Sequence, residues 1–147
     1  MPSEVKPLIA LPCACANLRR ASRVVTQVYD EELRAAGLKT TQFTLLQALH
    51  LITPVTQGRL AELLGIDSTT LTRTLRPLIQ KGWITSVPGS DKREHSLQLT
   101  SPGRRKLKQA EPLWQQAQER LRKGLGDRDW ENLRTITVRA AQAASAM

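Results

Sequence analysis

Two rows of side chains with different chemistry alternate around the segment from Asp67 to Lys81. Leu71, Leu75 and Leu78 follow the spacing i, i+4, i+7 and therefore share one face of a helix. A second row starts two residues earlier, about 200° around the helix, and consists of Thr69, Arg73 and Arg76. Hydroxyl groups bond to phosphates, and one guanidinium bonds to both O6 and N7 of guanine. The pattern predicts a helix that presents its polar row to the major groove of DNA; the alternative is a solvated helix with surface arginines.

A basic turn follows this segment. Lys92 and Arg93 lie in a run of turn-forming residues, 88–93, between two strand-like stretches. Cations at such a tip reach into a narrow minor groove or bridge phosphates. Asp91 is expected to hold Arg93, or a nearby arginine, through a charge-assisted hydrogen bond. The alternative is an ordinary polar hairpin turn.

The elements that position these residues follow from capping and turn signals. Thr56 is expected to cap a short helix that ends at Gly65, and Asp67 to cap the next helix, which runs to Lys81 before Gly82. Two short helices joined by a tight turn form a helix-turn-helix. Strands are expected at 83–87 and 95–99, with the basic turn between them.

Further helices flank this unit. One is expected from about Pro12 to Gly37, a second from a Thr40 cap to Thr53-Pro54, and two more after Thr100 and Gly126. The outermost helices carry apolar stripes that one small domain could hardly cover alone. The expected fold is mainly α with a small β-hairpin wing (α+β). We expect a flexible N-terminal arm at 1–12, a helical dimerisation region at 13–37 and 101–145, and a winged helix-turn-helix DNA-binding domain at 40–99.

Composition limits the class of partner. The 147 residues include 22 Lys and Arg against 13 Asp and Glu, a net charge of +9, and a homodimer would carry twice this charge. Such a balance favours a polyanion, with nucleic acid first and an acidic membrane surface second. The apolar run 8–11 is short and Pro12 interrupts it, so neither a signal peptide nor a membrane span is expected. We expect a cytoplasmic protein.

The two cysteines suggest a second kind of chemistry. Cys13 and Cys15 are too few for a disulfide framework and their spacing is not that of a zinc finger. They lie at the start of a predicted helix, whose N-terminus favours a reactive thiolate. A redox or metal response and inert packing are both open interpretations.

Other functional classes are less well supported. The chain lacks a glycine-rich phosphate loop, paired carboxylates and a nucleophile–histidine arrangement placed by local sequence, so we expect no enzyme activity, no cofactor and no metal site. A non-specific DNA-coating protein would explain the charge but not the polar row opposite the leucines. A membrane-surface bundle would need a basic amphipathic helix with aromatic anchors.

Several segments together resemble one known family. They are 60–73 (LAELLGIDSTTLTR), the turn Asp91-Lys92-Arg93, 99–104 (LTSPGR) and 37–43 (GLKTTQF). The chain is similar over residues 13–143 to the MarR (multiple antibiotic resistance regulator) family. The resemblance implies a homodimer with two winged domains on a pseudo-palindromic operator, acting as a repressor that small aromatic acids release from DNA.

The spacing argument and the resemblance together give two sets of predicted site residues. The predicted DNA contacts are Gln57, Arg59, Ser68, Thr69, Thr70, Thr72, Arg73, Arg76, Asp91, Lys92 and Arg93. A hypothetical effector pocket with aromatic walls and one guanidinium would be lined by Arg23, Gln27, Phe43 and Trp114. Trp114 is equally compatible with packing between helices.

Overall fold

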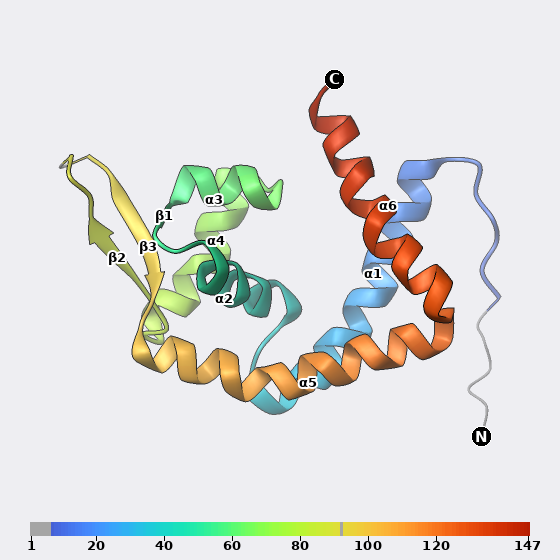
Figure 1. Cartoon of the computed structure of the whole chain (residues 1–147), viewed down its shortest axis with the longest axis horizontal. Helices are drawn as coiled ribbons and strands as arrows, with labels where there is room; N and C mark the ends of the chain where they lie inside the picture. The colour runs from blue at the N-terminus through green and yellow to red at the C-terminus, as the bar shows by residue number, and fades with distance from the viewer. Residues whose placement is uncertain (1–6, 92) are drawn as a thin grey trace.

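A computed structural model of the chain describes residues 7–91 and 93–147. The helices are α1 (Ala14–Leu33), the short 3₁₀ helix η1 (Arg34–Ala36), α2 (Thr40–Ile52), α3 (Gln57–Leu64), α4 (Ser68–Gln80), α5 (Ser101–Leu125) and α6 (Asp127–Ser145), and the strands are β1 (Val55–Thr56), β2 (Ile84–Pro88) and β3 (His95–Leu99). In Figure 1, α5 runs along one edge, with α2–α4 and the strands at one end and α1 and α6 at the other. The expected class, mainly helical with a small β wing, is confirmed.

The caps of the helix-turn-helix are those that the sequence predicts. The Thr56 hydroxyl accepts from the Arg59 N–H, and the Asp67 carboxylate accepts from the Thr70 N–H. Each cap satisfies a backbone donor that the helix itself cannot pair. Gly65 has φ 63°, a left-handed conformation that glycine adopts without a steric penalty, and it turns the chain between α3 and α4.

The start of α2 differs from the prediction. Thr40 was expected as the cap, but it is the first helical residue, and Lys39 occupies the cap position. The Lys39 N–H donates to Gln42 Oε1 at 3.0 Å. The Thr40 hydroxyl and N–H both donate to Asp30 Oδ1, at 2.6 and 2.7 Å. Thr40 therefore ties α2 to α1, a long-range use that its local sequence does not reveal.

The strands form one antiparallel sheet in the order β1-β3-β2. The pairs Ile84↔Leu99 and Pro88↔His95 set the register of the expected hairpin, β2 and β3. The sequence did not predict β1, where Val55 pairs with Leu97 and Thr56 with Ser96. β1 anchors the start of the helix-turn-helix to the wing.

The core lies beneath α4. Leu71, Leu75 and Leu78 are 0%, 1% and 0% exposed, so the predicted inward row is confirmed. The same core includes residues from every element except α6: Leu33, Ala36, Leu38, Phe43, Leu45, Leu46, Leu49, Val55, Leu60, Ile84, Leu97, Leu99, Leu107 and Ala110. Burial of the leucine face fixes which way the opposite face of α4 points.

A close joint connects the wing to α5. Thr100 caps α5, its N–H donates to the Trp83 carbonyl at 3.1 Å, and its hydroxyl donates to the Gly82 carbonyl at 2.5 Å. Gly103 lies against Trp83 so closely that a Cβ at this position would overlap the Trp83 carbonyl oxygen. Lys106 adds a third link, because its Nζ donates to the Ala36 carbonyl at 2.7 Å and lies 5.1 Å from the Trp83 ring centroid.

The other end of the molecule keeps apolar surface in water. Leu18 and Val24 of α1 are 50% and 46% exposed, and Ile136 and Val138 of α6 are 54% and 56% exposed. Within residues 7–91 and 93–147, no helix has the length and apolar character needed to cross a membrane.

Candidate nucleic-acid interface

The outward face of α4 forms an open polar hollow. It has a volume of about 390 Å³ and is lined by Ser68, Thr69, Thr72, Arg73 and Arg76. All five side chains are exposed. In the described part of the chain, no carboxylate forms an ion pair with either arginine. The row expected to face outward therefore lies together, and its guanidinium groups remain available for an anionic or base partner.

Thr70 has a different place from the one expected. Its hydroxyl donates to Asp67 Oδ2 at 2.6 Å and its N–H donates to Asp67 Oδ1 at 2.8 Å. These bonds, the hydroxyl first, lower the pKa of Asp67 from its ordinary value of 3.8. Thr70 does not line the hollow, so it belongs to the cap that starts α4.

The two residues expected from α3 have separate surroundings. Gln57 Nε2 donates to Thr72 Oγ1 at 2.8 Å, which links the first residue of α3 to the face of α4. Arg59 forms an exposed ion pair with Glu62 at 3.0 Å. An exposed pair of this kind contributes little to stability, so Arg59 is free to exchange Glu62 for a phosphate.

The wing tip holds Asp91 and Arg93, whereas Lys92 lies outside the described residues. Asp91 Oδ1 accepts from the backbone N–H of Arg93 at 3.2 Å. Among the residues described here, no arginine side chain forms an ion pair with Asp91, so the expected bond to a guanidinium is not present. Asp91 instead shapes the turn, since Glu94 N–H also donates to the Asp91 carbonyl at 3.0 Å. The Arg93 side chain is exposed.

The expected effector pocket does not form from its four residues. Phe43 is 1% exposed and stacks on Trp114 with the ring centroids 5.7 Å apart, so these two rings pack against each other. Arg23 and Gln27 are exposed on α1. Trp114 therefore contributes to the packing of the core, the alternative that the sequence left open.

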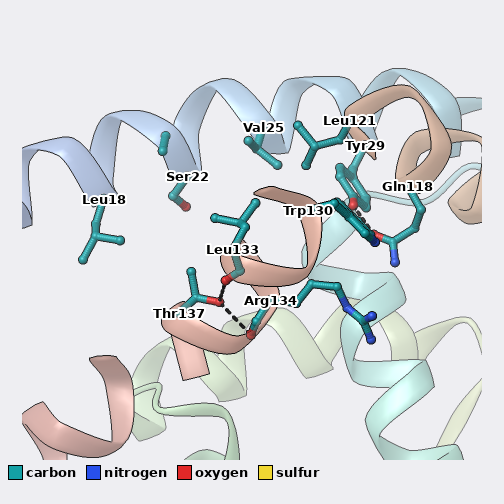
Figure 2. A pocket seen from close by; sticks show the side chains of 11 residues that line it. Leu18, Ser22, Val25, Tyr29, Gln118, Leu121, Trp130, Leu133, Arg134 and Thr137 are labelled. Atoms are coloured by element: carbon teal, nitrogen blue, oxygen red, sulfur yellow. Dashed lines mark hydrogen bonds between the residues drawn. The ribbon is translucent and has the colours of Figure 1, made fainter. Parts of the chain in front are cut away.

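An apolar hollow lies elsewhere, between α1, α5 and α6 (Figure 2). Its volume is about 450 Å³ and its lining is Leu18, Ala21, Ser22, Val25, Tyr29, Gln118, Leu121, Trp130, Leu133, Arg134 and Thr137. At the inner end the Tyr29 hydroxyl donates to Gln118 Oε1, and burial raises the pKa of Tyr29, which keeps this donor protonated. The sequence gave no signal for this hollow because its walls come from three helices far apart in the chain.

The cysteines are both exposed. Cys13 occupies the cap position of α1 and its Sγ accepts from the Ala16 N–H at 3.5 Å. Within the described ranges, no group of three or more His, Cys, Asp and Glu side chains is placed to hold a metal ion.

Known proteins share this arrangement. Residues 38–95 match the MarR family. The Mycobacterium tuberculosis transcriptional regulator MosR, solved in complex with DNA, is 38% identical, with 91% of this chain and 97% of MosR covered and a TM-score of 0.82. The HTH-type transcriptional regulator YwoH of Bacillus subtilis is 29% identical over 115 residues, 78% of this chain and 84% of YwoH. A mutant of Escherichia coli MarR, solved with operator DNA, shares the fold with a TM-score of 0.77 at 24% identity, over 86% of this chain and 91% of its own.

Proposed function

The chain belongs to the MarR family of transcription regulators, and from this premise we propose that it is a homodimeric repressor that binds a pseudo-palindromic DNA operator. The observation that carries the proposal is the division of α4, with buried leucines on one face and an exposed polar hollow on the other. Two of its structural relatives, MosR and the E. coli MarR mutant, were solved with DNA, which supports the same partner here.

Each part of the interface has a chemical role in this proposal. Arg73 and Arg76 bond to guanine edges in the major groove, and Ser68 and Thr69 bond to phosphates or base edges near the start of α4. Gln57 and Arg59 bond to the DNA backbone. Arg93 extends from the wing toward the minor groove.

Competition binding tests the proposal against a non-specific DNA-coating protein. A duplex selected from a random pool by the full chain is competed with bulk DNA at about 150 mM salt, where a regulator prefers its site by about 10³ or more. A preference near unity would favour the coating protein. The same duplex placed upstream of a reporter gene tests repression, because binding should lower expression.

The dimer is supported by the apolar residues that α1 and α6 leave exposed. Burial of Leu18, Ile136 and Val138 against a second copy would remove them from water. A second copy would also cover the open side of the hollow between α1, α5 and α6, where Leu18 and Ala21 lie, and turn it into an enclosed chamber.

We place the aromatic effector of the proposed repressor in that chamber. Tyr29 and Trp130 supply aromatic walls, each 9% exposed, and the Arg134 guanidinium lies 5.9 Å from the Trp130 ring centroid. One cation beside aromatic walls suits a small aromatic carboxylate.

The matched pair Arg134→Gln and Arg139→Gln tests this site, since both residues lie on α6 and only Arg134 lines the hollow. A panel of hydroxybenzoates should raise the melting temperature of wild type and Arg139→Gln and release both from DNA, and should affect Arg134→Gln less. Equal responses in the two variants would exclude the chamber as the site.

Thiol control is a second candidate mechanism of release, favoured by the exposure of both Cys13 and Cys15. Peroxide or copper should then release the wild-type protein from DNA and leave a Cys13→Ser/Cys15→Ser protein bound. Unchanged binding of both proteins would remove this mechanism.

A further inference from the structure

Thr72 occupies an unusual position among the threonines of α4. It lines the polar hollow, yet its hydroxyl is already bonded within the protein. The hydroxyl donates to the Ser68 carbonyl at 2.8 Å and accepts from Gln57 Nε2 at 2.8 Å. A threonine hydroxyl has one hydrogen and two lone pairs, so its hydrogen and one lone pair are used.

These two bonds determine what Thr72 offers to a partner in the hollow. The bond to the Ser68 carbonyl favours one side-chain rotamer, and the bond from Gln57 holds the hydroxyl from the α3 side. A hydroxyl with its only hydrogen committed is a poor donor to a base edge. The remaining group is the methyl, and the base feature that a threonine methyl contacts in the major groove is the C5-methyl of thymine.

We propose that Thr72 recognises a thymine in the operator through methyl–methyl contact, and that Gln57 is the positioning residue that holds Thr72 in this orientation. The inference rests on the proposed function and adds to it the identity of one base. It divides the labour on α4: the arginines donate hydrogen bonds to bases, while Thr72 excludes water from a methyl group.

The experiment uses the full chain and a duplex that this chain selects from a random pool. Each thymine of the selected duplex is replaced in turn by deoxyuridine, in both half-sites, which removes only the C5-methyl group. At one position the wild type should lose about fourfold in affinity per methyl contact, the value of one buried methyl-sized group.

Two substitutions at position 72 separate the methyl from the hydroxyl. Thr72→Ser keeps the hydroxyl and removes the methyl, so the preference for thymine over uracil at that position should disappear. Thr72→Val keeps a methyl and removes the hydroxyl, so a preference should remain. Gln57→Ala should reduce the preference, and adding it to Thr72→Ser should change the thymine-to-uracil ratio no further.

Thr74→Ser is the matched control, because the Thr74 hydroxyl also donates to a carbonyl one turn earlier, that of Thr70, and Thr74 does not line the hollow. It should leave the thymine preference unchanged, and thermal melting should show each variant folded. The proposal is overturned if no uracil position distinguishes wild type from Thr72→Ser, or if Thr72→Val loses the preference that Thr72→Ser keeps. If the pool yields no preferred sequence, the proposed function fails with it; if it yields one without this pattern, only the role of Thr72 fails.

Discussion

Side chains on the first turns of α4 have separate tasks although their types are similar. The Thr70 hydroxyl bonds to Asp67 and completes the cap, the Thr72 hydroxyl joins α3 to α4, and Ser68 and Thr69 line the hollow. A sequence shows four hydroxyl groups in a row, but only coordinates show which of them are already bonded. The predicted set of DNA contacts was therefore too large by at least Thr70.

The arginines of the hollow should affect binding differently from the arginine of the wing. Arg73→Ala should cost about 1–3 kcal/mol at the selected duplex and relax the base preference there, because a bidentate contact to guanine is lost. Arg93→Gln should weaken binding to all duplexes similarly and flatten the salt dependence by about one unit. Titrations at several salt concentrations on selected and scrambled duplexes measure both effects, and identical behaviour of the two variants would refute the division.

The cap at Asp67 gives the protein a specific response to acid. The pKa of Asp67 is lowered in the folded chain, so its contribution to stability is fully present above its ordinary value of 3.8 and is lost as the pH falls through the lower folded value. Asp67→Asn retains a capping oxygen but cannot titrate. Melting temperatures from about pH 5 downward should therefore fall less steeply in Asp67→Asn than in wild type below pH 3.8. Parallel curves would show that Asp67 does not contribute to the acid response.

At the scale of elements, the joint between the wing and α5 depends on a missing side chain. Gly103→Ala would bring a Cβ onto the Trp83 carbonyl oxygen, so the chain must shift, and we expect a loss of about 1–3 kcal/mol in the free energy of unfolding. Gly124→Ala lies in the same helix with no atom within 4 Å of the added Cβ, and it should be neutral or stabilising by up to about 1 kcal/mol. Urea denaturation compares the two, and an equal effect would contradict the proposed clash.

Elements defined by nearby residues were predictable, and those defined by distant ones were not. Thr56, Asp67 and Thr100 cap their helices through residues three positions away, so sequence signals were sufficient. β1 has two residues and exists only because β3, some forty residues later, pairs with it. The stacking of Phe43 on Trp114 likewise joins helices far apart in sequence, and it removed both rings from the effector pocket that the sequence had suggested.

At the scale of the whole molecule, the exposed apolar residues predict self-association. Ile136→Glu should shift the mass measured by light scattering from twice 16.4 kDa toward the single-chain value, because a charge would be buried between two copies. Leu51→Glu is the control, since Leu51 is 74% exposed on α2, in the DNA-binding half of the chain. A monomeric wild type, or an equal shift in both variants, would exclude this surface as the dimer interface.

The joint at Gly103 also makes α5 a rigid lever. The wing base is fastened to the first turn of a helix of 25 residues, about 37 Å long. A tilt of only about 5° at its far end, where α1 and α6 lie, would carry the wing sideways by about 3 Å. Such a displacement is as long as a hydrogen bond, so small angular changes near the termini suffice to disengage an arginine at the opposite end from its partner on DNA.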